Sequence, residues 1–132
     1  MRAEGLELAQ RFSDAIQARE VPDGLFADDC EIENVPTAVT ARKYVGSEGF
    51  LHWMQELFDA FGEDVTFEQE PLAAEDDWVV GMLRIAGHGS SSGLPLELRW
   101  VGVLWFGDGL IRRCAGFASR REAFAAVGRE LD

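Results

Sequence analysis

Residues 96–117, LELRWVGVLWFGDGLIRRCAGF, contain two strand-like runs that are joined by a Gly-Asp-Gly turn at 107–109. Glycine and aspartate tolerate the positive φ angles of tight hairpin turns, so the stretch predicts an antiparallel hairpin. One face of the first run carries Leu96, Leu98, Trp100, Gly102, Leu104 and Phe106. The middle of its other face is also apolar, and because side chains alternate between the faces of a strand, both faces are expected to be covered.

The second face of this run carries Val101, Val103 and Trp105, flanked by Glu97 and Arg99. An exposed apolar band of about several hundred Å² is costly in water and usually marks an interface. The sequence shows no spare element that would cover this band. We therefore predict a homodimer that packs through the outer face of the sheet, with the charged pair at its rim.

Further strands are expected at about 65–71, 78–86 and 110–117, and helices at about 5–19, 21–26 and 47–61. The third helix has the clearest pattern, because its apolar residues recur at helical spacing along one face: Phe50, Trp53, Met54, Leu57, Phe58 and Phe61. Ser47 is a candidate cap for its start, and Gly62 for its end. Ser119 and Glu122 fit a capping box that opens a short C-terminal helix.

Composition indicates one folded domain over residues 1–132, with 47% hydrophobic residues, four Trp and nine Phe to build a core. The formal net charge of -12 would repel phosphate groups, so nucleic acid and anionic membrane surfaces are not expected as partners. The N-terminus does not resemble a signal peptide, and no apolar run has the length of a membrane span. We therefore expect a cytoplasmic protein.

A family resemblance is carried by the order of three segments. Residues 26–34, FADDCEIEN, are expected to lead from the end of an amphipathic helix into a short strand, and residues 44–49, YVGSEG, to open the third helix. Strand-like runs then follow to residue 117. This order is similar to the SnoaL-like branch of the nuclear transport factor 2 superfamily over about residues 5 to 127. The resemblance implies an α+β fold in which a strongly curved, mostly antiparallel sheet forms a cone around an apolar cavity, wrapped by three N-terminal helices and followed by a short C-terminal helix.

The same resemblance implies where a ketosteroid isomerase would keep its catalytic groups. The general base would stand at Asn34, a tyrosine oxyanion donor at Phe12 and a protonated acid at Gly102. An amide has no basic site near neutral pH, and the other two residues have no side-chain donor for a developing enolate. Steroid isomerisation by that mechanism is therefore not expected.

We predict that one cavity is lined by eight residues: Phe12, Asn34, Trp53, Leu57, Met82, Arg84, Trp100 and Cys114. Arg84 would then stand on an otherwise apolar face, where an unpaired charge is costly. Two alternatives remain open for it. It clamps an anion or a carbonyl of a ligand, or it forms an internal salt bridge or reaches solvent at the cavity mouth.

The chain also resembles limonene epoxide hydrolase at the level of the fold. That enzyme needs carboxylates beside such an arginine, whereas Glu31 and Glu33 are expected to point outward here.

The remaining candidates for chemistry are two histidines and two cysteines. His52 is expected on the protein surface, and His88 in a Gly/Ser-rich connection. Cys30 and Cys114 are expected as free thiols, with one disulfide between them as the alternative. Their spacing matches no metal site, so we predict no metal and no cofactor.

Two functions remain open from the sequence. The first is a non-catalytic module that binds a small apolar or weakly anionic molecule in the cavity. The alternative is a SnoaL-like enzyme, an isomerase, cyclase or hydrolase that acts on a small hydrophobic metabolite. The sequence leaves open whether the segments 36–43 and 87–93 close over the mouth of the cavity.

Overall fold

The structure, a computed structural model, describes residues 3–34, 43–62, 64–88 and 93–129. The elements follow in the order α1 (Ala3–Ala18), β1 (Phe26–Glu33), β2 (Lys43–Val45), α2 (Gly46–Phe61), β3 (Thr66–Ala74), β4 (Trp78–His88), β5 (Pro95–Gly107), β6 (Leu110–Phe117) and α3 (Arg120–Ala126). None of the helices in these ranges is long and apolar enough to cross a membrane. Two segments whose closure over the cavity the sequence leaves open, 36–43 and 87–93, lie mostly outside the described residues.

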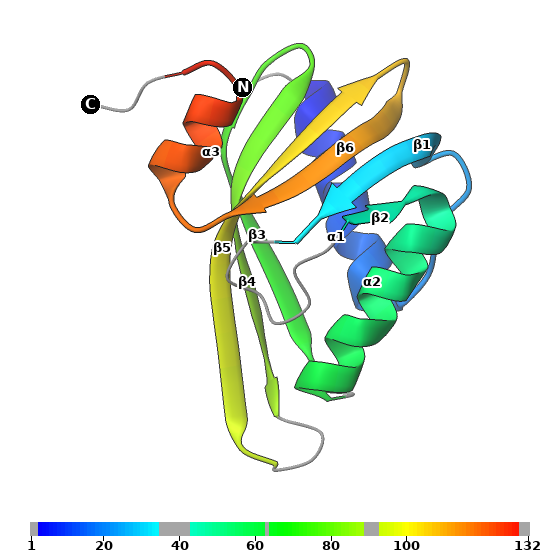
Figure 1. Ribbon diagram of the computed structural model, residues 1–132, viewed down its shortest axis with the longest axis vertical. Coiled ribbons are helices and arrows are strands. Elements are labelled where there is room, and N and C mark those ends of the chain that lie inside the picture. Colours follow the sequence, from blue (N-terminus) through cyan, green and yellow to red (C-terminus); the bar gives the residue numbers. More distant parts are fainter. Residues whose placement is uncertain (1–2, 35–42, 63, 89–92, 130–132) are drawn as a thin grey trace.

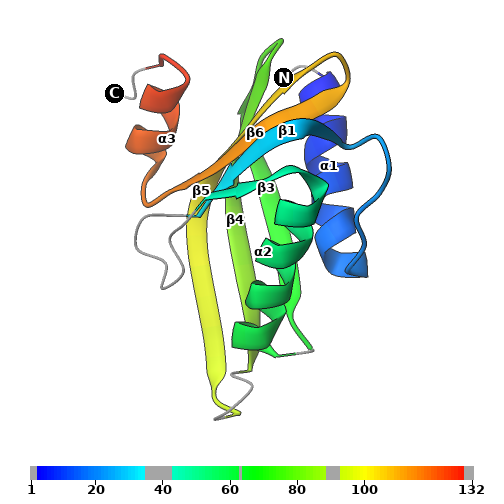
Figure 2. The ribbon, with the colours of Figure 1, turned by 45° about the vertical axis from the view of Figure 1, so that its right-hand side comes forward.

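The six strands form one sheet in the order β2-β1-β6-β5-β4-β3. Neighbouring strands are antiparallel except β1 and β6, which run parallel. The helices α1 and α2 cover one side of this curved sheet, and α3 lies on the opposite side (Figures 1 and 2). β4 and β5 extend beyond the other strands, and α2 runs alongside their far halves (Figure 1). The predicted α+β class with a curved, mostly antiparallel sheet is confirmed.

Local sequence signals explain several of the element boundaries. β5 and β6 are joined by a two-residue turn in which Asp108 and Gly109 have φ angles of 55° and 76°, which confirms the hairpin. The Ser119 hydroxyl accepts a hydrogen bond of 3.2 Å from the backbone N–H of Glu122, as the capping box predicts. Gly62 ends α2 with a φ of 89°. Ser47 does not cap α2, because the helix already begins at Gly46.

The predicted short helix at 21–26 is wrong. Phe26 is the first residue of β1, and Gly24 turns the chain into it with a φ of 75°. Leu25 is fully buried, and its carbonyl accepts a hydrogen bond of 2.8 Å from the N–H of Ile111 in β6. The segment is thus tied to the sheet by a backbone hydrogen bond, and two helices rather than three precede the long strands in the described part of the chain.

Three glycines stand in register across the sheet. Gly81 of β4 pairs with Gly102 of β5, which in turn pairs with Gly116 of β6. A Cβ atom at Gly102 would lie 2.5 Å from Cδ1 of Leu83, so the neighbouring side chain occupies the space that a larger residue would need. Glycines inside strands commonly mark a bend or a close approach, and here the row crosses the concave side of the sheet.

The outer face of the sheet is covered by the chain itself. One buried cluster joins this face to α3. It contains Trp78 and Val80 of β4, Val101 and Val103 of β5, and Ala123 and Phe124 of α3. Val101 and Val103 are 3% and 1% exposed. The prediction that these two valines form an exposed band is therefore wrong, because the short C-terminal helix covers them. The capping box predicted that helix but not the face on which it packs.

The homodimer itself stays a prediction. Trp105, the third residue of the predicted band, is half-buried and lies beneath the guanidinium of Arg113, with 4.4 Å between Cζ and the ring centroid. An interface on this side of the sheet would have to use the surface that α3 leaves open around Trp105 and Met82.

Substituting Phe124 tests whether α3 covers this face. Phe124→Ala should lower the free energy of unfolding by about 3 kcal/mol, because it opens a cavity against Val101 and Val103. Urea denaturation measures the change, and Ala126→Ser at an exposed position of the same helix is the control. A loss below about 1 kcal/mol would mean that α3 does not seal the face.

Candidate ligand-binding cavity

A cavity of about 500 Å³ lies between the two N-terminal helices and the concave side of the sheet. The helices contribute seven residues to its wall: Ala9, Phe12, Trp53, Glu56, Leu57, Ala60 and Phe61. The long strands contribute mostly apolar residues and glycines, among them Val79, Gly81, Leu83, Leu98, Trp100, Gly102 and Leu104. Ligand cavities in proteins have this size and this largely apolar character.

Six of the eight predicted residues line this cavity: Phe12, Asn34, Trp53, Leu57, Trp100 and Cys114. Phe12 of α1 stacks on Trp53 of α2, with 6.2 Å between the ring centroids. The positions at which the resembled isomerase keeps its catalytic groups, Phe12, Asn34 and Gly102, therefore share one cavity wall.

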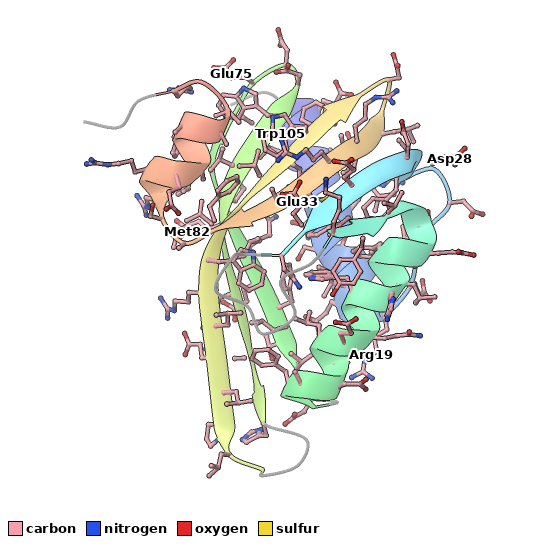
Figure 3. The ribbon with its side chains drawn as sticks, in the orientation of Figure 1. Arg19, Asp28, Glu33, Glu75, Met82 and Trp105 are labelled. Atoms are coloured by element: carbon pink, nitrogen blue, oxygen red, sulfur yellow. The ribbon has the colours of Figure 1, made fainter. Side chains whose placement is uncertain are left out.

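The placement of Met82 and Arg84 in the cavity wall is wrong. The inner face of β4 is formed by Val79, Gly81 and Leu83, whereas Met82 packs in the outer cluster with α3. Figure 3 shows Met82 on the side of the sheet where α3 lies. Both faces of β4 are apolar near its middle, so alternation did not distinguish the inner face from the outer one.

Arg84 is held by carboxylates on the outer face. Its Nη1 lies 3.2 Å from Glu68 Oε1 and its Nε lies 3.0 Å from Glu97 Oε1, which also accepts from Arg99 Nε at 2.6 Å. The hydrogen bonds from Arg99 and Arg84 lower the pKa of Glu97, and Glu97 raises the pKa of Arg84. Of the two alternatives for Arg84, the structure shows ion pairing rather than an anion clamp inside the cavity.

Asn34 and Trp53 are joined by a hydrogen bond. The indole Nε1–H of Trp53 donates to Oδ1 of Asn34 at 2.5 Å, and Trp53 is 7% exposed. The bond satisfies the one polar group of a buried indole and fixes the orientation of the amide, whose Nδ2 is a donor.

Glu56 is a cavity residue that the sequence did not reveal. Its Oε2 accepts a hydrogen bond of 2.9 Å from the hydroxyl of Tyr44 in β2, and its Oε1 lies 3.2 Å from Nε2 of His52. The rings of Tyr44 and His52 meet edge to face at 5.8 Å. One signal was present, because position 56 is three residues after Trp53 and so falls on the cavity side of α2.

Glu33 borders the cavity but is paired on the outer side. Its Oε1 lies 3.4 Å from Nη2 of Arg113 and 3.9 Å from Nζ of Lys43. Glu31 also pairs with Lys43, at 3.4 Å. Figure 3 shows Glu33 near Trp105, on whose ring Arg113 is stacked. The outward orientation expected for these two acids agrees with their ion pairs.

The two cysteines are buried free thiols. Cys114 lies in the cavity wall, and burial raises the pKa of its thiol well above the ordinary value, as does its hydrogen bond with Cys30. A thiol in this setting stays protonated near neutral pH and is a poor nucleophile. His52 is exposed, as expected, and exposed His88 pairs with Asp64 at 2.9 Å.

No group of three metal-binding side chains comes together within the described ranges.

The fold is an α+β cone with a cavity between its helices and its sheet. Residues 9–114 match the model of the SnoaL-like domain family, so the chain belongs to that family. A comparison with curated protein sequences gives no match.

Solved structures with the same fold share little sequence with this chain. Bal32a from a soil-derived mobile gene cassette superposes with a TM-score of 0.74 at 16% identity, over 86% of this chain and 87% of that one. RV0760c from Mycobacterium tuberculosis, in complex with estradiol-17beta-hemisuccinate, superposes with a TM-score of 0.69 at 22% identity, over 87% of this chain and 93% of that one. AusH from Aspergillus nidulans superposes with a TM-score of 0.70 at 19% identity, over 91% of this chain and 86% of that one. At these identities the likeness establishes the fold alone.

The bond between Trp53 and Asn34 leads to a stability prediction. Asn34→Leu should cost about 1–3 kcal/mol of unfolding free energy, because it leaves a buried indole N–H without its acceptor. The same change made in a Trp53→Phe background should cost clearly less, which a double-mutant cycle by urea denaturation measures. Equal costs in both backgrounds would show that the bond contributes nothing.

Proposed function

We propose that this protein binds a small, neutral, largely apolar molecule in the cavity between its helices and its sheet. The observation that carries the proposal is a cavity of about 500 Å³ whose wall is aromatic and aliphatic, with a few polar groups such as Asn34 and Gln69. Such a wall contributes affinity through apolar burial, and its polar groups orient the ligand. The complex of RV0760c with estradiol-17beta-hemisuccinate supports a ligand with an apolar ring system, and its added carboxylate makes it the charged member of the test below.

The charge around the cavity favours a neutral ligand over an anionic one. Glu56 lies in its wall, Glu33 and Glu97 stand at its edge with their carboxylates in ion pairs on the outer side, and the net charge of the chain is -12. Arg84, which would have attracted an anion, pairs with Glu68 and Glu97 on the outer face. A ligand with a carboxylate would therefore meet like charges as it enters.

The second candidate function is that of a SnoaL-like enzyme, and the Glu56 carboxylate in the cavity wall is the observation that favours it. Phe12, Asn34 and Gly102 do line the cavity, but they supply neither a base nor an oxyanion donor like those of the isomerase. A catalytic reaction would therefore have to use Glu56 in a different arrangement.

Two ligands that differ in one charge test the preference for a neutral molecule. Estradiol should bind more tightly than estradiol-17beta-hemisuccinate at pH 7, by about five- to tenfold, because the extra carboxylate costs about 1 kcal/mol beside the acidic residues. Isothermal titration calorimetry measures the dissociation constants of both ligands, and added salt should reduce the difference between them. Tighter binding of the hemisuccinate would refute the charge argument.

An obstruction at α2 tests whether the cavity is the binding site. Ala60 is an exposed residue of the wall, so Ala60→Trp should fill the cavity without straining the core and weaken estradiol binding at least about tenfold, or about 1.4 kcal/mol. Ala18→Trp, at an exposed position of α1 outside the cavity, is the matched control. If both variants bind like the unaltered chain, the ligand binds elsewhere and the proposal fails.

A further inference from the structure

The side-chain amide of Gln69, on β3, is open to the cavity. Gln69 lines the cavity wall and is half-buried. Among the described residues, no hydrogen bond reaches its Oε1 or its Nε2. A primary amide carries an acceptor and a donor side by side in one plane. Both groups are therefore available to a molecule inside the cavity.

Most other polar side chains of the wall are engaged with the protein. Those that form ion pairs or hydrogen bonds with other side chains are Glu33, Asn34, Trp53, Glu56, Glu97 and Cys114. Trp100 is buried and its indole N–H has no acceptor within the described ranges, but an indole can only donate. In the part of the wall that the structure describes, Gln69 is thus the side chain whose donor and acceptor are both open.

A second glutamine close to β3 shows what an engaged amide looks like. Gln17 of α1 accepts a hydrogen bond of 3.0 Å from the backbone N–H of Phe67, and its Nε2 donates to the carbonyl of Val65 at 3.3 Å. That amide holds the helix against the strand. Gln69 follows Phe67 by two residues, so its side chain is on the same face of β3 but serves no such contact.

Glycines on the neighbouring strands leave space for the amide. Gln69 Oε1 lies 3.7 Å from the position that a Cβ atom on Gly81 would occupy, so the side chain reaches from β3 over β4. Leu83, which pairs with Gln69 in register, leans over Gly102 of β5 instead. Both glycines line the cavity. The amide therefore lies on the concave side of the sheet, beside a residue that has no side chain to cover it.

The open amide restricts which ligands can bind well. Water in an empty cavity can satisfy both of its groups, whereas a pure hydrocarbon would displace that water and leave a donor and an acceptor unmatched in apolar surroundings. A site of this kind favours ligands with the complementary groups and rejects analogues that lack one of them.

We infer that Gln69 recognises the polar edge of the ligand, and that this edge is a lactam on a neutral, planar fused-ring molecule. The lactam N–H donates to Oε1 of Gln69, and the lactam carbonyl accepts from Nε2. Aromatic residues of the wall, among them Phe12, Trp53 and Trp100, provide surfaces for the flat rings. The inference rests on the proposed function, because the ligand has to occupy the same cavity.

Other polar groups fit this amide less well. A ketone accepts from Nε2 but leaves Oε1 without a donor. A hydroxyl group has one oxygen and cannot pair with both groups of the amide in its plane. A carboxylate offers no donor and brings a negative charge towards Glu56. The lactam satisfies both groups and stays neutral.

Two probes of the same shape test the inference. Phenanthridinone is a planar lactam, and benzochromenone is the corresponding lactone, in which a ring oxygen replaces the N–H. Phenanthridinone should bind the unaltered chain about tenfold more tightly, because the lactone has no donor for Oε1. A fluorescence titration of each probe measures the two dissociation constants.

Gln69→Met removes both hydrogen-bonding groups and keeps an unbranched side chain of similar length. The preference for the lactam should fall below about twofold in this variant, through weaker binding of the lactam. Gln55→Met, at an exposed position of α2 outside the cavity, is the matched control and should keep the tenfold preference. Gln69→Glu retains an acceptor for the N–H, so it should still prefer the lactam.

The stability of the ligand-free protein separates recognition from structural support. Gln69→Met should keep or raise the thermal unfolding midpoint, because it replaces an open amide in an apolar wall with an apolar side chain. A lower midpoint together with weakened binding of both probes would indicate a structural role and overturn the inference.

The remaining outcomes distinguish the two levels of the argument. Equal binding of lactam and lactone by the unaltered chain overturns the role of Gln69, as does a lactam preference that persists in Gln69→Met. Binding of estradiol without binding of either probe also overturns it, and the proposed function stands. If estradiol and both probes fail to bind, the proposed function fails as well.

Discussion

β4 and β5 are buried on both faces over residues 78–81 and 100–104, and the arrangement of the molecule depends on that constraint. Their inner faces carry Val79, Ile85 and Leu104 into the main core, and their outer faces carry Val80 and Val103 against α3. Each face therefore needs its own cover. The N-terminal helices cover one side but stand far enough from the glycine row to leave a cavity, whereas α3 packs closely on the other side.

This double burial explains which parts of the fold the sequence could predict. The hairpin turn, the apolar face of α2 and the capping box are local signals, and each appears in the structure at the expected residues. The faces of β4 are a non-local property. Arg84 pairs with Arg99 in register, so an even-numbered residue of β4 shares its face with an odd-numbered residue of β5. That parity depends on the length of the connection between the strands, which no residue pattern fixed.

The residues of the cavity wall also divide into those that local spacing predicts and those that depend on tertiary contacts. Trp53 and Leu57 follow from the spacing of α2, and Trp100 follows from the parity of β5. Glu56 was not predicted because a single acid beside an apolar stripe usually faces solvent, and only the contact with Tyr44 from β2 shows that its carboxylate is held in place. Tertiary contacts of this kind join residues from different elements, so helical periodicity gives the direction of a side chain but not its partner.

The structure also gives Asn34 a physical role. Phe12 stacks on Trp53, and the indole of Trp53 donates to Asn34, so the two positions that resemble catalytic sites of the isomerase instead hold one aromatic ring. A carboxylate at position 34 would accept the same hydrogen bond but add a second negative charge to a cavity that already contains Glu56. The neutral amide therefore accepts the hydrogen bond of Trp53 without placing another negative charge beside Glu56.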